Sequence, residues 1–122
     1  MVAVAKAVAP GTSEVFANGR AIDVEHLSRM TLGERSLERE VLALFDRQAD
    51  MLLPRIRRGD PALAAASAHT LKGSAVGIGA FGVARAAEAV ERARDGSTAA
   101  AIDTLAAVLE EAKAEIARLL AN

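Results

Sequence analysis

Apolar residues recur at intervals of three and four along most of this chain, and that spacing favours helices over strands. The clearest stripe consists of Ala64, Ala68, Leu71, Ala75 and Ile78. A second stripe, near the C-terminus, consists of Ile102, Leu105, Leu109, Ala112, Ile116 and Leu119. Each stripe places its side chains on one face of a helix. Both segments are therefore predicted to be amphipathic helices that bury one face.

Glycine, proline and capping residues divide the chain into helices. Asp23 is a good N-cap for a short helix that extends to about Met30. Gly59-Asp60-Pro61 combines a residue that ends one helix with a cap and a first residue for the next. Gly79 and Gly96-Ser97 mark two further boundaries. A helix is expected between these two boundaries, and its inward residues are expected to be Val83, Ala87 and Val90.

The segment from Thr31 to about Arg58 is predicted to be a long helix. Thr31 and Glu34 have the spacing of a capping box. The apolar face of this helix is predicted to comprise Leu37, Val41, Leu44, Phe45, Leu52 and Ile56. Gln48 falls inside that face, and the pattern does not explain it.

Together these segments predict an all-α domain over residues 22–122. Four long amphipathic helices with short connections favour an antiparallel, up-and-down four-helix bundle, preceded here by the short extra N-terminal helix. Residues 1–21 contain the turn signals Pro10-Gly11 and Asn18-Gly19 but no helical periodicity. They are expected to be a weakly ordered N-terminal extension.

Composition excludes several function classes. The 122 residues include no Cys, so disulfides and thiol chemistry are excluded. The net charge of −1, with no Trp or Tyr, argues against nucleic-acid binding. No apolar run reaches the ~18 residues that span a membrane. We therefore expect a cytoplasmic protein, a monomer that binds neither membrane nor nucleic acid.

One of the two histidines lies on the outward face of a predicted helix. His69 is more than about 90° from the centre of the Ala64–Ile78 stripe around the helix axis. The small or apolar residues on the same face are Ala62, Ala65, Ala66, Gly73, Val76 and Gly77. A solvent-facing helix surface is normally polar or charged. This face, with Thr70 at its edge, is therefore a candidate contact surface for a partner that approaches His69 closely.

The neighbours of His69 suit phosphoryl chemistry. A neutral imidazole nitrogen is a competent nucleophile near neutral pH. Lys72, three residues on, lies on an adjacent part of the surface and would neutralise the charge of a phosphoryl group. Gly73, one turn beyond His69, would leave room for the phosphate and for its donor.

The segment His69-Thr70-Leu71-Lys72-Gly73-Ser74-Ala75, with Gly79 ten residues after the histidine, resembles the signature of histidine-containing phosphotransfer (HPt) domains. Softer similarity extends over about residues 22–120 and includes Glu91 in the helix after the motif. The resemblance implies a four-helix bundle in which His69 takes a phosphoryl group from the aspartyl phosphate of one receiver domain. His69 then passes it to the aspartate of another receiver.

The same resemblance implies roles for the neighbouring residues and for the partners. Lys72 matches the family's charge-neutralising position, and Gly73 matches its space-making position. The partners implied are receiver domains of response regulators or of hybrid histidine kinases. The receiver would supply the Mg²⁺, so this chain is expected to hold no metal or other cofactor. With no ATP site recognisable, it is expected to be a relay intermediate without kinase activity of its own.

Other readings of the sequence are weaker. Gly77-Ile78-Gly79-Ala80-Phe81-Gly82 fits the dinucleotide-binding pattern, but the preceding residues have helical rather than strand periodicity. A histidine kinase would need an ATP-binding domain, and metal-assisted hydrolysis would need a cluster of ligands. The remaining alternative is a non-catalytic helical interaction module in which His69 is incidental.

Overall fold

The protein is described by a computed structural model that covers residues 21–94 and 96–122. These residues form five helices: α1 (Val24–Met30), α2 (Arg35–Arg57), α3 (Pro61–Ile78), α4 (Phe81–Arg92) and α5 (Thr98–Ala121). They contain no strand, so the predicted all-α class is confirmed. The expectation of a weakly ordered extension falls on residues 1–20, which lie outside the described part, and on Ala21, which packs against the core.

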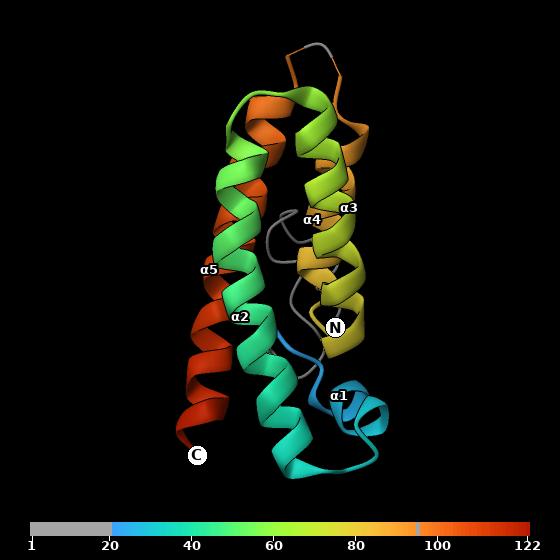
Figure 1. Ribbon diagram of the computed structural model, residues 1–122, viewed down its shortest axis with the longest axis vertical. Helices are drawn as coiled ribbons and strands as arrows, with labels where there is room; N and C mark the ends of the chain where they lie inside the picture. The colour runs from blue at the N-terminus through green and yellow to red at the C-terminus, as the bar shows by residue number, and fades with distance from the viewer. Residues whose placement is uncertain (1–20, 95) are drawn as a thin grey trace, which may run out of the picture.

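Helices α2 to α5 form an antiparallel bundle (Figure 1). Helix α2 packs against α3 and α5, and α4 packs against the same two helices from the other side. The short connections make each helix run opposite to the one before it, as predicted. Helix α1 lies across the end of the bundle where α2 begins, and it contacts α3. None of the helices in the described part has the length and hydrophobicity needed to span a membrane.

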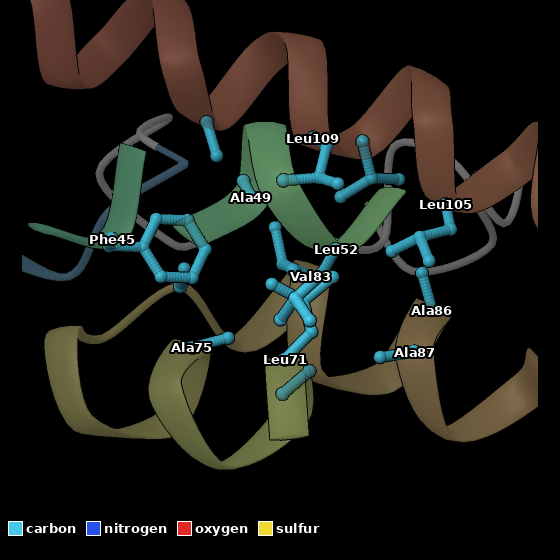
Figure 2. Close-up of a cluster of buried hydrophobic side chains, with 14 of the residues drawn as sticks. Phe45, Ala49, Leu52, Leu71, Ala75, Val83, Ala86, Ala87, Leu105 and Leu109 are labelled. Atoms are coloured by element: carbon cyan, nitrogen blue, oxygen red, sulfur yellow. The ribbon is translucent and has the colours of Figure 1, made fainter. Parts of the chain in front are cut away.

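The core is formed by side chains from all four long helices (Figure 2). The predicted stripe of α3 is buried along its whole length, and Ala68, Leu71 and Ala75 are fully inaccessible to solvent. Leu105 and Leu109 of α5 meet these residues from the opposite side of the core. The inward residues predicted for α4 are also buried, namely Val83, Ala87 and Val90.

The prediction for the apolar face of α2 was partly wrong. Leu37 and Leu44 are exposed rather than buried. The buried stripe consists of Leu42, Phe45, Ala49, Leu52 and Ile56. This stripe steps by three and four residues through Ala49, a small residue that the predicted face left out. Because α3 and α5 both pack on α2, the face that they cover is rotated away from Leu37 and Leu44.

The predicted capping box at Thr31 was also wrong. Helix α2 begins at Arg35, and its N-cap, Glu34, makes no capping hydrogen bond through its side chain. The hydroxyl of Thr31 instead donates to the carbonyl of Leu27 at 2.8 Å, at the end of α1. Leu32 and Gly33 both have positive φ angles and turn the chain between the two helices. Asp60, in contrast, caps α3 as predicted, through the amide groups of Ala62 and Leu63.

Gly79 ends α3 and fixes α1 against it. Its φ angle of 83° is in the left-handed region, and its carbonyl accepts a hydrogen bond from the Asp23 amide at 2.9 Å. A Cβ atom at this position would lie 2.7 Å from the Asp23 carbonyl oxygen. Gly79 therefore lies at a junction between helices, with Gly77 before it in α3 and Gly82 after it in α4. The dinucleotide-binding reading is excluded because helix α3, not a strand, precedes them.

An ion cluster joins α2 to α5 on the side of the bundle opposite α3 and α4. The Nζ atom of Lys113 lies 2.6 Å from Asp46 and 2.8 Å from Asp50. Burial lowers the pKa of Lys113, but the hydrogen bonds and negative charges of the two carboxylates outweigh it. The pKa of Lys113 is therefore raised above its ordinary value of 10.5.

Replacing Gly79 by Ala should lower the free energy of unfolding by at least about 2 kcal/mol. The left-handed backbone alone costs a side chain about 1–2 kcal/mol, and contact with the Asp23 carbonyl adds to this. Urea unfolding followed by circular dichroism would measure the change. The matched control is Gly73→Ala: a Cβ there meets nothing within 4 Å, so it should be neutral or stabilising by up to ~1 kcal/mol. Equal effects of the two substitutions would contradict this account.

The Lys113 cluster should stabilise the fold at neutral pH and lose its effect in alkali. Because the pKa is higher in the folded state, the stabilisation is fully present below the unfolded-state value of 10.5 and is lost as the pH rises through the folded-state value. Urea titrations of wild type and Lys113→Met at several pH values would measure the difference. If the free energy of unfolding of wild type exceeded that of Lys113→Met by the same amount in strong alkali, the charge of Lys113 would not be the cause.

Candidate functional site

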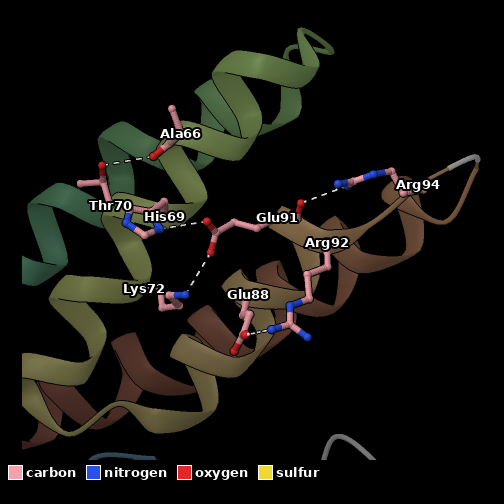
Figure 3. Close-up of polar contacts among 8 residues, drawn as sticks. All are labelled: Ala66, His69, Thr70, Lys72, Glu88, Glu91, Arg92 and Arg94. Carbon is pink, nitrogen blue, oxygen red and sulfur yellow. Dashed lines mark hydrogen bonds and ion pairs between the residues drawn. The ribbon is translucent and has the colours of Figure 1, made fainter.

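His69 lies at the middle of α3 on its outward face, and 70% of its side chain is exposed (Figure 3). The neighbouring Ala68 and Leu71 are completely buried. Their packing fixes the rotation of the helix, so the backbone of His69 is held firmly while its ring reaches solvent. The expected outward orientation of His69 agrees with the structure.

The imidazole ring is held from a second helix. Its Nδ1 atom lies 2.9 Å from Oε2 of Glu91, which projects from α4. The other carboxylate oxygen of Glu91, Oε1, lies 3.3 Å from Nζ of Lys72. One carboxylate therefore holds both the ring and the ammonium group, as Figure 3 shows.

The charge state of Glu91 determines which ring nitrogen is available. Burial raises the pKa of Glu91, but hydrogen bonds from His69 and Lys72, with their positive charges, outweigh this and lower the pKa below 4.5. An ionised carboxylate only accepts hydrogen bonds, so Nδ1 of His69 must be the donor. In the neutral ring the second nitrogen, Nε2, then carries the free electron pair. The arrangement presents Nε2 as a nucleophile.

Gly73 and Gly77 leave open space on the same face of α3. A Cβ atom added at either residue would meet no heavy atom within 4 Å outside its own helix backbone. Neither glycine has a positive φ angle, so the backbone does not require it. Each costs roughly 1 kcal/mol of helix stability relative to Ala. The packing of this chain gives no reason for the two glycines, which fits a surface that another molecule approaches closely.

The other predicted contact residues differ in their exposure to solvent. The exposed ones are Ala62, Ala66, Thr70 and Val76, and the half-buried ones are Ala65 and Gly77. The hydroxyl of Thr70 donates to the carbonyl of Ala66 at 3.2 Å, which keeps it within its own helix. The residues of α3 around the ring are thus mostly small, and Lys72 is the only cationic residue of α3 beside it.

Glu91 is the site residue to which the sequence analysis gave no role. It lies 22 residues after His69 and on another helix, so the wheel of α3 alone does not reveal it. The available signal was the position of Glu91 at the buried edge of α4, one residue after the inward Val90. The other histidine, His26, is not part of this site. Its Nε2 contacts the carbonyl of Val76 at 2.9 Å, and its ring packs edge-on against Phe81.

The donor set of the site is poor for a metal. Throughout residues 21–94 and 96–122, no three His, Cys, Asp or Glu side chains come together in a way that would hold an ion. Near His69 the one carboxylate is already occupied by the ring and by the ammonium group.

Comparisons with known proteins agree on one family. Residues 36–121 match the Hpt domain. The crystal structure of Histidine Phosphotransferase ShpA from Caulobacter crescentus is similar, with 30% sequence identity and a TM-score of 0.66. That match covers 80% of this chain and 88% of the other. No curated protein matches the sequence. Because the domain match spans well over half of the sequence, the chain belongs to the Hpt domain family.

Proposed function

We propose that this chain takes a phosphoryl group from the aspartyl phosphate of a receiver domain onto His69 and passes it to the aspartate of another receiver. Membership of the Hpt family gives the chain a role in phosphorelay. The observation that carries the finer proposal is the contact between Nδ1 of His69 and Glu91, which leaves Nε2 exposed and nucleophilic. The partners are receiver domains of response regulators or of hybrid histidine kinases.

The proposed transfer is a substitution at phosphorus. The electron pair on Nε2 attacks the phosphorus atom of the acyl phosphate, a P–N bond forms, and the P–O bond to the aspartate breaks. The aspartate leaves as a carboxylate, and the ring, still protonated on Nδ1, becomes a phosphoimidazolium. The second step is the reverse, with the carboxylate of another receiver as the nucleophile. Because the ring gains positive charge, the neighbouring carboxylate of Glu91 stabilises the intermediate.

Lys72 and Gly73 serve the phosphoryl group itself in this proposal. The ammonium of Lys72 is held beside the ring by Glu91 and would balance the negative charge that arrives on Nε2. The open space at Gly73 would admit both the phosphoryl group and the partner's active site. The Mg²⁺ would be held by the partner receiver, where it neutralises phosphoryl charge. No kinase step is assigned to this chain.

Replacing His69 by Gln should abolish phosphorylation while leaving the fold intact, because the side chain is exposed. The chain would be incubated with the phosphorylated receiver domains of the same organism. Wild type should gain phosphate that is labile in acid and stable in base, as expected of phosphohistidine. Phosphoramidate, a small phosphoryl donor, would be tested in parallel.

Two results would contradict the proposal. One is a wild-type chain that gains no phosphate from any active receiver, which would favour an interaction module in which His69 is incidental. The other is a His69→Gln variant that gains as much phosphate as wild type. Circular dichroism of both proteins would establish that they are folded.

Replacing Glu91 by Ala should slow phosphorylation by phosphoramidate roughly tenfold, equivalent to about 1.4 kcal/mol in the barrier. The substitution removes the acceptor for Nδ1 and the anion beside the forming imidazolium. Ring ¹⁵N chemical shifts should change from one dominant tautomer, protonated on Nδ1, to a mixture. The matched control is Glu88→Ala, which removes a carboxylate of the same helix that pairs with Arg92 at 2.8 Å. An unchanged tautomer in the Glu91 variant would remove this residue from the mechanism.

A further inference from the structure

Glu91, which holds the ring of His69, lies at the end of its helix. Helix α4 ends at Arg92, so the backbone of Glu91 belongs to the last turn. The last four carbonyl groups of a helix have no partner within the helix, and the last turn frays unless other groups satisfy them. The carboxylate that selects the tautomer of His69 is therefore carried by the part of α4 that the helix itself secures least.

Core packing secures α4 only as far as the residue before Glu91. Val90 is 4% exposed and is the last buried residue of the helix. Arg92 lies on the outer surface, where its guanidinium pairs with Glu88 of the same helix at 2.8 Å. An ion pair between two surface side chains contributes little to stability. The last turn of α4 therefore depends on support from the residues that follow it.

The side chain of Arg94 supplies that support. Its Nη1 atom donates hydrogen bonds to the carbonyl of Ala93 at 2.9 Å and to the carbonyl of Glu91 at 3.3 Å; Figure 3 shows the second of these. The guanidinium group thus places a permanent positive charge at the C-terminal end of α4. A cation is favourable there because it satisfies carbonyl groups and because it opposes the helix dipole.

Ser97 in turn fixes the backbone of Arg94. Its hydroxyl accepts a hydrogen bond from the Arg94 amide at 3.1 Å and donates one to the Arg94 carbonyl at 2.8 Å. The amide of Ser97 donates to the same carbonyl at 3.1 Å. Ser97 occupies the N-cap position of α5, yet its side chain makes no capping hydrogen bond to that helix. Its hydroxyl therefore serves the connection between α4 and α5 rather than the start of α5.

A series of hydrogen bonds thus leads from this connection to the ring. Ser97 holds the backbone of Arg94, and the guanidinium of Arg94 holds the main chain of Glu91. The carboxylate of Glu91 then accepts from Nδ1 of His69. Because Arg94 binds the carbonyl of Glu91 rather than its carboxylate, both carboxylate oxygens remain directed at His69 and Lys72.

We propose that Arg94 is a positioning residue of the site, which keeps the last turn of α4 helical and so holds the carboxylate of Glu91 at Nδ1 of His69. The importance of this placement for phosphoryl transfer rests on the proposed function. Arg94 acts through the main chain of Glu91. Its loss should therefore weaken the choice of tautomer without removing a group that reacts.

Replacing Arg94 by Met keeps the aliphatic part of the side chain and removes the guanidinium. Ring ¹⁵N chemical shifts of His69 would measure its two neutral tautomers. The minor one, protonated on Nε2, should increase roughly two- to fivefold, the range expected when a helix end loses a cation. The rate of phosphorylation by phosphoramidate should also fall, by less than the roughly tenfold expected for Glu91→Ala. Ser97→Ala should change both quantities in the same direction.

Two controls separate positioning from a general loss of stability. Arg92→Met removes a guanidinium from the same end of α4, but one that pairs with the side chain of Glu88, so it should change the tautomer less than Arg94→Met does. Adding Arg94→Met to Glu91→Ala should change the tautomer no further, because the carboxylate through which Arg94 acts is then absent. Circular dichroism and urea unfolding would verify that all variants are folded.

Three results would overturn the inference. The first is an Arg94→Met variant in which His69 keeps the tautomer of wild type. The second is an equal change in Arg92→Met. The third is a further change when Arg94→Met is added to Glu91→Ala, since Arg94 would then act by another route. Failure of the proposed function would look different, because wild type itself would take no phosphate from any receiver, whatever the tautomers of the variants.

Discussion

The structure depends on the burial of one face of α3. Ala68, Leu71 and Ala75 are completely inaccessible to solvent, and α2, α4 and α5 all contribute side chains to the core around them. Apolar burial supplies most of the free energy that holds such a bundle together. Because the inner face of α3 alone provides this apolar burial, the residues of its outer face are not needed for packing. The outer face is free to consist of small residues and one exposed imidazole.

The carboxylate of Glu91 links this scaffold to the chemistry. It accepts hydrogen bonds from His69 and Lys72 of α3 while belonging to α4. Its lowered pKa keeps it ionised at neutral pH, so the ring has a preferred tautomer and the ammonium group has a fixed neighbour. Helix packing offsets the free-energy cost of holding these three polar groups together, because it fixes their backbones before any partner binds.

Much of the fold could be predicted from the sequence because local signals agreed with the tertiary structure. The stripe of α3, the cap at Asp60 and the stop at Gly79 are examples. The errors occurred where tertiary contacts decide. Ala49 is buried and Leu44 is exposed, and only the positions of α3 and α5 explain this choice. The location of His69 followed from its own helix, whereas its contact with Glu91 required knowledge of how α4 packs beside α3.

The position of Glu91 on a separate helix also connects chemical competence with conformational stability. If α4 opened locally, His69 would keep its place on α3 but would lose the acceptor that selects its tautomer. Such a molecule would be largely helical yet poorly prepared to react. In the proposed function, the fraction of chains ready to receive a phosphoryl group would therefore depend on the docking equilibrium of α4. Mutations in the α3–α4 contact, far from solvent, would then appear in assays as slow phosphotransfer rather than as unfolding.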